Sequence, residues 1–371
     1  MSFCWGRSEL EYKIKSKDSD FDTQLLTGAG KLIKMGKFFR TSPVTIRRRR
    51  LEGVLGIIVQ NAVELFTTAR EVGKPGQQVL AEREPDAFTF AMADEREKVL
   101  AVELTLEGRF RSVPVTVFAS VSPLCKCHVK VVPKCDSLLP QHLSEDMLLY
   151  GLCLLDKSTR TDFRLIFDSL ATRAVTNHFH YDGMYLASTG LANGRFPIEN
   201  TPRAVIAGEI CPGGVAIELL QEVSWYARGF VVSAGGRKED KELFPKGDNE
   251  PLARVAARVV EELQRRNIPH TVLLAPPHEP RVPKKVNFEA AVTGQIEGMQ
   301  FPQTNEIYIV PRPYQEDSPL GVEVAGLVLA KTEELYSSVN EAALKEHFVS
   351  NVQCKGKLFD DLLCKVAWMA I

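Results

Sequence analysis

Short β-type segments follow one another along most of this chain, and few helix-like segments separate them. They are rich in Val, Ile, Leu and Phe and end at Gly, Pro or charged residues, which is typical of strands. Parallel neighbours need long crossover connections, so strands in close succession favour an antiparallel sheet. We therefore expect an α+β fold rather than a doubly wound parallel sheet. The expected strands are 53–60, 87–92, 99–106, 113–121, 128–133, 163–167, 176–186, 203–207, 229–234, 271–275, 307–310 and 321–329.

Apolar residues at helical spacing, after a serine suited to the N-cap position, predict a helix over 144–157. Residues 1–37 mix charges and glycines without a clear period, so we expect an N-terminal extension or a loosely packed helix there. A loop rich in Gly, Pro and Asn at 188–202 divides the remainder into two units, 38–190 and 191–371. The other expected helices are 215–222, 251–266, 339–349 and 358–369.

Charge and hydropathy exclude several classes of protein. The 46 basic and 47 acidic residues leave a net charge of −1, so no general electrostatic attraction to nucleic acid or to a membrane is expected. No apolar run approaches the roughly 18 residues of a membrane helix, and the first residues lack the apolar core of a signal peptide. Eight cysteines are too few for a disulfide scaffold in 371 residues. We expect a cytoplasmic protein with reduced thiols.

The segment 176–186 (TNHFHYDGMYL) carries the strongest candidate for chemistry. Side chains on a strand alternate between its two faces, so we expect His178, His180 and Asp182 on one face. Two imidazoles beside a carboxylate supply a nucleophile or base, together with a group that fixes its tautomer. The spacing alone leaves three interpretations open: a nucleophilic histidine, a metal site formed by the three side chains, or a structural strand with exposed polar residues.

Two further clusters are less specific. Cys125, Cys127, His128 and Cys135 lack the paired spacing of a zinc site, and we interpret the cysteines as buried thiols at the end of a strand. The basic run 47–50 precedes a strand and could face phosphate. We favour a solvated edge that discourages strand pairing.

A series of short motifs follows along residues 38–371: GIIVQN at 56–61, VSP at 121–123, HVKVVP at 128–133, LPQ at 139–141, FR at 163–164, SL at 169–170, NHFH at 177–180, YLA at 185–187, NIP at 267–269 and IVP at 309–311. Their order resembles that of the GDP-hexose phosphorylases, which act on GDP-L-galactose in plants and GDP-glucose in animals. That family lies in the galactose-1-phosphate uridylyltransferase branch of the histidine triad superfamily. The resemblance implies two histidine-triad-like halves with antiparallel sheets flanked by helices, the first half carrying the active site.

The resemblance also implies a reaction. His180 occupies the position of the family's nucleophile and would attack the α-phosphorus of a GDP-hexose, releasing hexose 1-phosphate and leaving a guanylyl-histidine. Inorganic phosphate would then remove the nucleotide as GDP, while His178 would support the hydrogen bonding of the site. The family needs no metal for this step, so we expect a nucleotidyltransferase without a metal or other cofactor. A homodimer is a family-level expectation.

Several positions that contact substrate in the relatives carry other residues here. Asp182 stands where relatives have Gln or His, and Asp168 and Ser120 stand where they have Asn. Arg173 lies in a stretch that usually contains Gly, and Phe88 lies in an AFTF segment that resembles the family's KFNF. The substrate contacts that the resemblance implies are Asp182, Asp168, Ser120, Arg173, Asn177 and Phe88.

Two carboxylates beside a phosphate are unfavourable. A pair of unit charges about 4 Å apart costs on the order of 4 kcal/mol at an effective dielectric constant near 20. Three explanations remain open at this point. The carboxylates are protonated or shielded, for example by Arg173; the site binds a less anionic ligand; or the chain keeps the fold without activity and serves as a binding or regulatory protein.

Overall fold

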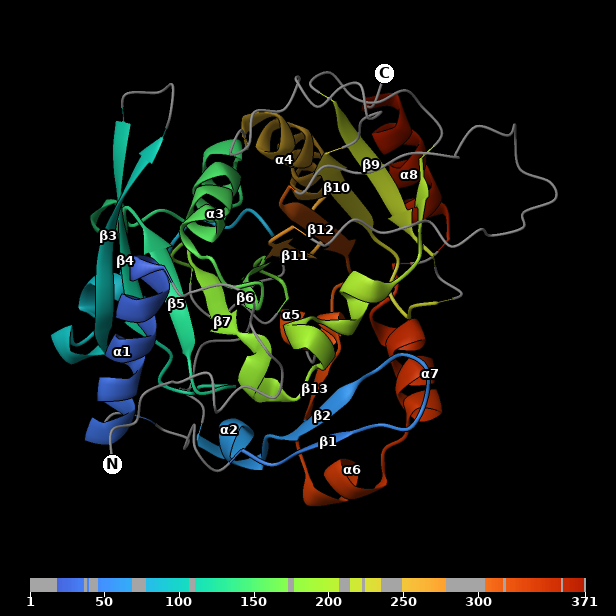
Figure 1. Ribbon diagram of the computed structural model, residues 1–371. Coiled ribbons are helices and arrows are strands. Elements are labelled where there is room, and N and C mark those ends of the chain that lie inside the picture. The colour runs from blue at the N-terminus through green and yellow to red at the C-terminus, as the bar shows by residue number, and fades with distance from the viewer. Residues whose placement is uncertain are drawn as a thin grey trace.

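The computed structural model describes residues 19–36, 39, 46–68, 78–106, 111–172, 177–206, 214–221, 224–234, 249–277, 304–315, 318–354 and 356–369. In this part of the chain, ten strands form one antiparallel sheet in the order β3-β4-β5-β7-β6-β11-β12-β10-β9-β8 (Figure 1). The expected α+β class is confirmed. The strands are β3 (Lys98–Leu106), β4 (Arg111–Ala119), β5 (His128–Pro133), β6 (Phe163–Asp168), β7 (Tyr181–Tyr185), β8 (Arg203–Val205), β9 (Val215–Leu220), β10 (Phe230–Ala234), β11 (His270–Ala275) and β12 (Glu306–Pro311).

The strand order repeats within this sheet. Read inward from the edges, β3-β4-β5-β7-β6 has the same arrangement as β8-β9-β10-β12-β11. Antiparallel pairing of β6 with β11 joins the two series, and it places Thr271 opposite Asp168. Helix α3 (Glu145–Lys157) precedes β6, and helix α4 (Glu250–Arg265) precedes β11 in the same relative place. The sheet therefore consists of two similarly ordered halves joined at its centre.

In the described part of the chain, helices cover one face of the sheet (Figure 1). Helices α3 and α4 pack against each other there, next to α1 (Asp20–Met35) and α8 (Lys357–Met369). Their apolar stripes meet the inward side chains of the strands, such as Phe167. The predicted N-cap of α3 is confirmed, since the Ser144 side chain accepts a hydrogen bond from the amide of Met147.

The other face of the sheet packs against a second, smaller layer. Its core contains Ile166, Met184 and Leu273 from the large sheet and Leu327 from the small one. Strands alternate their side chains, so Asp168, two residues after Ile166, points toward this layer. The layer contains β1 (Arg48–Arg50), β2 (Ile58–Asn61), β13 (Leu327–Ala330), α2 (Val63–Thr68), α5 (Gly321–Ala325), α6 (Glu333–Ser338) and α7 (Glu341–Asn351).

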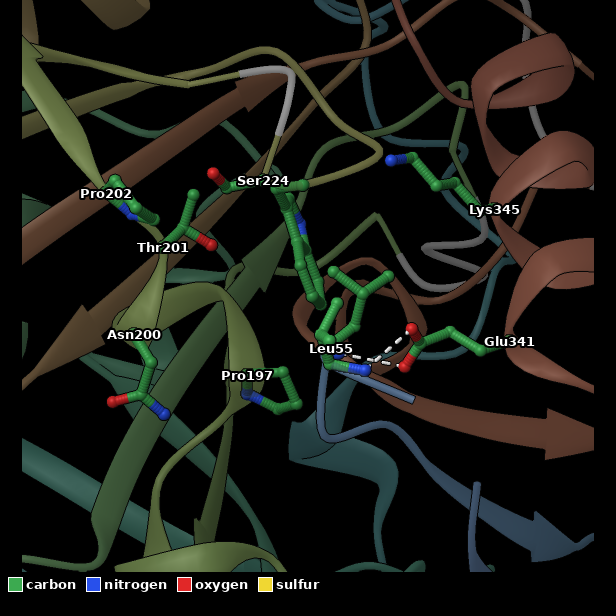
Figure 2. Close-up of a pocket in the computed structure, with 10 residues that line it drawn as sticks. Leu55, Pro197, Asn200, Thr201, Pro202, Ser224, Glu341 and Lys345 are labelled. Carbon is green, nitrogen blue, oxygen red and sulfur yellow. Dashed lines mark hydrogen bonds between the residues drawn. The ribbon is translucent and has the colours of Figure 1, made fainter. Parts of the chain in front are cut away.

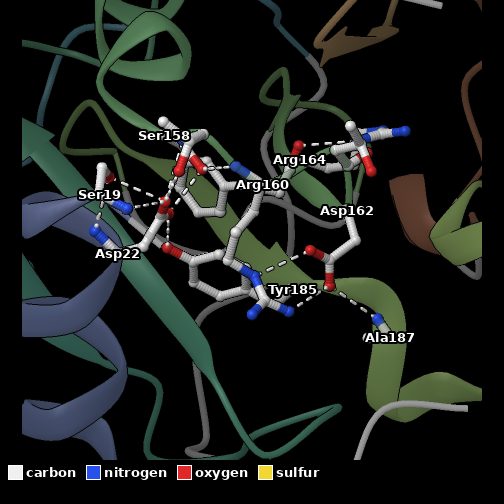
Figure 3. Close-up of polar contacts among 11 residues, drawn as sticks. Ser19, Asp22, Ser158, Arg160, Asp162, Arg164, Tyr185 and Ala187 are labelled. Atoms are coloured by element: carbon white, nitrogen blue, oxygen red, sulfur yellow. Dashed lines mark hydrogen bonds and ion pairs between the residues drawn. The ribbon is translucent and has the colours of Figure 1, made fainter. Parts of the chain in front are cut away.

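Helix α1 is attached to the large sheet by hydrogen bonds of one buried carboxylate. Figure 3 shows the buried Asp22 carboxylate among donors from three segments. It accepts hydrogen bonds from the Ser19 hydroxyl at 2.8 Å and the Ser158 hydroxyl at 2.6 Å. It also accepts from the Thr159 amide at 2.9 Å and the Tyr185 hydroxyl at 2.7 Å. Since Tyr185 ends β7, the described part of the expected extension is a well-packed helix fastened to a central strand.

Three predicted elements were wrong, and the strand predicted at 53–60 begins only at Ile58. Residues 215–220 form strand β9 and not a helix, because pairing with β8 and β10 outweighs their helical spacing. Residues 321–329 divide into α5 and β13 at Gly326, whose φ of 113° ends the helix. Residues 87–92 are a turn that leads into a 3₁₀ segment at Phe90–Met92.

The basic run lies at the expected sheet edge, since β1 is an edge strand of the small sheet and Arg47 and Arg50 are exposed. The two arginines between them also bind other segments. Arg48 donates hydrogen bonds to Gln60 and to the carbonyl oxygens of Leu124 and Ser188. Arg49 donates to the carbonyls of Tyr336 and Val339. Within the described residues, these guanidinium groups connect β1 to distant segments. In the same part of the chain, no helix combines the length and hydrophobicity needed to cross a bilayer.

Candidate active site

Strand register brings the candidate residues together on the face that meets the smaller layer. β5 and β7 pair so that Lys130 lies opposite Asp182, and β6 and β7 pair so that Ile166 lies opposite Asp182. Ile166 packs into the core beneath that layer. Side chains of paired residues share a face, so Lys130 and Asp182 lie on this face too. Alternation along β5 adds His128.

His180 precedes the first residue of β7, and its ring is held in one tautomer. Its Nδ1 lies 2.9 Å from the carbonyl oxygen of His178, which can only accept a hydrogen bond. Nδ1 therefore carries the proton, and Nε2 keeps its lone pair. The His180 ring packs 5.1 Å from the ring of Phe90. This arrangement is that of a neutral imidazole ready to act as a nucleophile.

Burial keeps His180 neutral. The residue is 7% exposed, and burial, reinforced by the Lys130 ammonium, lowers the pKa of His180 to about 4. The Asp182 carboxylate acts in the opposite direction, because it favours a positive ring. At neutral pH the imidazole is thus unprotonated, and a nearby negative charge can stabilise a cationic state formed later.

Gln141 fixes the backbone of His180. The Gln141 Oε1 accepts from the His180 amide at 2.9 Å, and its Nε2 donates to the carbonyls of His180 at 3.2 Å and Asp168 at 3.1 Å. The β6–β7 pairing ends at Ile166 and Asp182, which is two residues short of Asp168 on one strand and of His180 on the other. The buried amide therefore substitutes for ladder hydrogen bonds where the two strands separate.

We expected His178 to lie on the strand, but β7 begins only at Tyr181. Its Nδ1 accepts a hydrogen bond from the Phe90 amide at 2.9 Å. Burial lowers the pKa of His178 to about 4, and Arg83 acts in the same direction. His178 thus holds the 3₁₀ segment at Phe90–Met92 against the site and presents its carbonyl to His180. Phe179 and Tyr181 pack into the core on the opposite face of the sheet.

Asp182 has two basic partners. Its Oδ1 lies 2.5 Å from the Lys130 Nζ and 2.6 Å from the His128 Nε2. The His128 Nδ1 accepts from the Leu124 amide, so Nε2 is the protonated nitrogen that donates to Asp182. Burial opposes ionisation, but Lys130 and His128 outweigh it and hold the pKa of the Asp182 carboxyl well below its usual range. The Lys130 charge therefore offsets the Asp182 charge.

Asp168 has separate partners. It accepts from the Thr271 hydroxyl at 2.5 Å and the Gly321 amide at 2.9 Å, and the Arg312 guanidinium lies 3.6 Å away. Burial raises the pKa of Asp168, and Arg312 and Thr271 offset this only in part. A side chain at Gly321 would clash, since a Cβ there would lie 2.6 Å from Ile166. Each of the two carboxylates thus has its own cation, Lys130 or Arg312. Arg173 lies outside the described residues.

The other residues expected to contact substrate are Ser120, Asn177 and Phe88, and each has a different environment. Ser120 is buried beside β5, where its amide donates to the His128 carbonyl. The Asn177 side chain accepts from the Gln141 amide and donates to the Ala81 carbonyl, so it supports the loop before His180. Phe88 is half-buried and packs edge-on against Phe90 at 5.6 Å.

Sequence reasoning missed the roles of Lys130, His128, Gln141 and Arg312. Alternation along 128–133 would have placed His128 and Lys130 on one face, but only the register shows that this face meets Asp182. The predicted buried thiols are confirmed at Cys125 and Cys127, and burial raises the pKa of Cys125 to about 12. No group of three or more His, Cys, Asp or Glu residues in the described chain is arranged to hold a metal ion.

Comparison with known proteins identifies relatives of this chain. Residues 20–184 match the family described as GDPGP1-like, N-terminal domain. GDP-D-glucose phosphorylase 1 of Homo sapiens is 28% identical over 344 residues, which is 91% of this chain and 81% of that protein. These matches make the chain a relative of the GDP-hexose phosphorylases, with its residues 20–184 similar to the GDPGP1-like N-terminal domain. The matched segment contains His178, His180, Asp182 and the strand that carries Lys130.

Other relatives extend the likeness. GDP-L-galactose phosphorylase 2 of Arabidopsis thaliana is 30% identical over 162 residues, covering 44% of this chain and 33% of that protein. The crystal structure of yeast Ap4A phosphorylase Apa2 in complex with Ap4A superposes with a TM-score of 0.51. The alignment covers 89% of this chain and 98% of Apa2, at 12% sequence identity. That likeness establishes a shared fold.

Proposed function

We propose that this GDPGP1-like chain is a nucleotidyltransferase that cleaves a GDP-hexose with inorganic phosphate, through a guanylyl-histidine at His180. The observation that carries the proposal is the Nδ1 hydrogen bond to the His178 carbonyl, which leaves Nε2 with its lone pair. A pKa of about 4 keeps that lone pair free at neutral pH. The relatives named GDP-D-glucose and GDP-L-galactose phosphorylase support the choice of substrate.

In the first step, Nε2 of His180 bonds to the α-phosphorus, and the bond from that phosphorus to the bridging oxygen breaks. The electron pair leaves with the oxygen as hexose 1-phosphate. The ring then carries a positive charge, which the His178 carbonyl and the Asp182 carboxylate stabilise. In the second step, an oxygen of inorganic phosphate attacks the phosphorus, the N–P bond breaks, and GDP leaves the neutral imidazole.

Lys130 is the cation that we assign to the phosphates. Its ammonium has three N–H donors and binds the Asp182 carboxylate, on the same face of the sheet as His180. A phosphate that approaches His180 can share these donors with Asp182. The Lys130 charge then removes the repulsion that an isolated carboxylate would exert on the substrate. In this proposal Asp182 does not prevent phosphate binding.

The aromatic segment next to the site suits the base. Phe88 is half-buried and packs against Phe90, which in turn packs against His180. Partly exposed aromatic rings bind nucleobases by stacking, which is worth about 1–3 kcal/mol per base. We assign the guanine to Phe88, while Ser120, Asn177 and Asp168 shape the surrounding walls.

The repeated strand order supports two histidine-triad-like halves, 38–190 and 191–371, of which the first carries the chemistry. His180 immediately precedes β7, and Asn305 immediately precedes the corresponding strand β12. Asn305 binds Asp156 and Asn249 and offers no nucleophile. The homodimer and the cytoplasmic location expected from the sequence stay predictions.

Phosphorus NMR of a nucleotide-sugar panel with inorganic phosphate tests the proposal. Wild type should release GDP and hexose 1-phosphate from at least one GDP-hexose, and His180→Ala should release neither. Without phosphate, wild type should accumulate an acid-labile, alkali-stable guanylyl adduct that peptide mapping places on His180. His347→Ala is the matched control, because His347 is an exposed histidine on α7. A folded wild type without turnover of any nucleotide sugar would exclude this reaction and favour a binding or regulatory role.

A further inference from the structure

A cavity of about 330 Å³ opens on the smaller layer and shares no residue with the His180 site. Four segments line it: the β1–β2 turn, the loop before β8, the segment before β10, and α7 (Figure 2). Ligand sites in proteins start at about 300 Å³, so the volume suits one small molecule and is too small for a dinucleotide. The lining includes Leu55, Pro197, Thr201, Trp225, Glu341 and Lys345.

Stacked rings and a carboxylate clamp preform the walls. Trp225 stacks on Tyr226 at 4.1 Å, and Tyr226 stacks on Phe348 of α7 at 4.4 Å. Across the cavity, the Glu341 carboxylate accepts from the amides of Val54 at 2.9 Å and Leu55 at 2.8 Å. These contacts hold the turn and the helix at a fixed separation, so a ligand would meet a site that is already organised.

Two residues that line this cavity each have a buried polar atom without a hydrogen-bond partner among the described residues. The atoms are the indole Nε1 of Trp225 and the hydroxyl of Thr201, in residues that are 1% and 3% exposed. Figure 2 shows the Thr201 hydroxyl directed toward the interior of the cavity. An unpaired buried polar group costs about 1–3 kcal/mol, so two of them on one cavity need a physical reason. A ligand with hydrogen-bond acceptors supplies one.

The other lining groups narrow the chemistry of that ligand. Lys345 brings a positive charge, and Ser224 and Asn200 add further polar groups. Pro197 and Pro202 offer flat apolar surfaces that suit the C–H face of a sugar ring. Glu341 retains lone pairs that can accept from sugar hydroxyls. We infer that this cavity is a second ligand site, for a monosaccharide phosphate whose phosphate meets Lys345 and whose ring oxygens meet Trp225 and Thr201.

The test follows the indole N–H signal of Trp225 in nitrogen–proton correlation NMR of the full chain. The chain has three tryptophans, and Trp225→Phe assigns the signal because it removes the N–H and keeps a ring to stack on Tyr226. Glucose 1-phosphate should shift this signal downfield and saturably, as a free donor gains an acceptor. Glucose alone and inorganic phosphate alone should bind about tenfold more weakly or worse, since each supplies half of the contacts.

Substitutions separate this cavity from the catalytic site. Thr201→Val and Lys345→Gln should each weaken glucose 1-phosphate binding about tenfold or more, while the exposed Lys357→Gln should not. The inference would be overturned if glucose 1-phosphate bound to both variants as well as to wild type, or if it left the Trp225 indole signal unshifted. A change only in the exchange of the Trp225 N–H with water would overturn it as well. The measurement needs no turnover, so its failure and a failure of the proposed phosphorolysis are distinguishable.

Discussion

The side-chain amide of Gln141 holds His180 by its backbone, accepting from its N–H at 2.9 Å and donating to its carbonyl at 3.2 Å. The same amide donates to the Asp168 carbonyl at 3.1 Å. One side chain thus connects the backbone at His180 with the end of strand β6, where Asp168 lies. The position of the His180 ring depends on this bridge, because the ordinary β6–β7 ladder does not extend so far.

We expect Gln141→Ala to lower kcat on the order of 100-fold, because a shift of about 1 Å in a reacting group has that effect. Gln264→Ala is the matched control. Gln264 bonds the amide and carbonyl of Leu143 in the same way, but away from His180. Both variants should lose about 1–3 kcal/mol of unfolding free energy, as buried backbone groups lose partners. Equal losses of kcat in the two variants would show that Gln141 acts only through stability.

The low pKa of His180 predicts the pH dependence of guanylylation. An imidazole with a pKa of about 4 is unprotonated above that value, so the rate should stay flat from pH 8 down to about pH 5. Single-turnover release of hexose 1-phosphate without inorganic phosphate measures this, since free phosphate does not then titrate in the assay. Lys130→Met should move the acid limb upward, because the Lys130 charge lowers the pKa of His180. A limb near pH 6.5 in wild type would contradict the buried environment.

Lys130 and Asp182 should behave as a coupled pair. Lys130→Met leaves the Asp182 charge without its cation, so the KM for phosphate should rise by at least tenfold and unfolding free energy should fall. Asp182→Asn in the same chain should recover much of both losses, because it removes the unpaired charge. A double-mutant cycle on stability should give a coupling energy of about 1–3 kcal/mol. Additive effects would mean that the 2.5 Å contact contributes nothing.

Asp22 should matter for stability and not for the chemical step. Asp22→Asn replaces an acceptor-only group by an amide that cannot serve all its donors, among them the Tyr185 hydroxyl (Figure 3). Urea unfolding should show a loss of about 2–4 kcal/mol, while kcat of the folded fraction stays within twofold. Asp20→Asn, at an exposed position of the same helix, should change stability by less than about 0.5 kcal/mol.

The sequence by itself determined much of the local structure and supplied a candidate nucleophile. Period-two patterns located strands such as β5, and Ser144 marked the start of α3, because these signals depend on neighbours in the chain. The NHFH motif indicated His180 through its resemblance to a family. The helix predicted over 215–222 was wrong, because pairing with two adjacent strands decided the conformation of residues 215–220.

Only the tertiary structure decided how the charges are balanced. From the sequence, Asp182 and Asp168 were expected to disfavour phosphate binding. In the structure, the strand register places Lys130 beside Asp182, and the β12–α5 connection places Arg312 beside Asp168. These partners lie 52 and 144 residues away in the chain, so no local pattern links them. Strand register and the packing of distant segments are fixed by the burial of whole faces, which is a property of the assembled sheet.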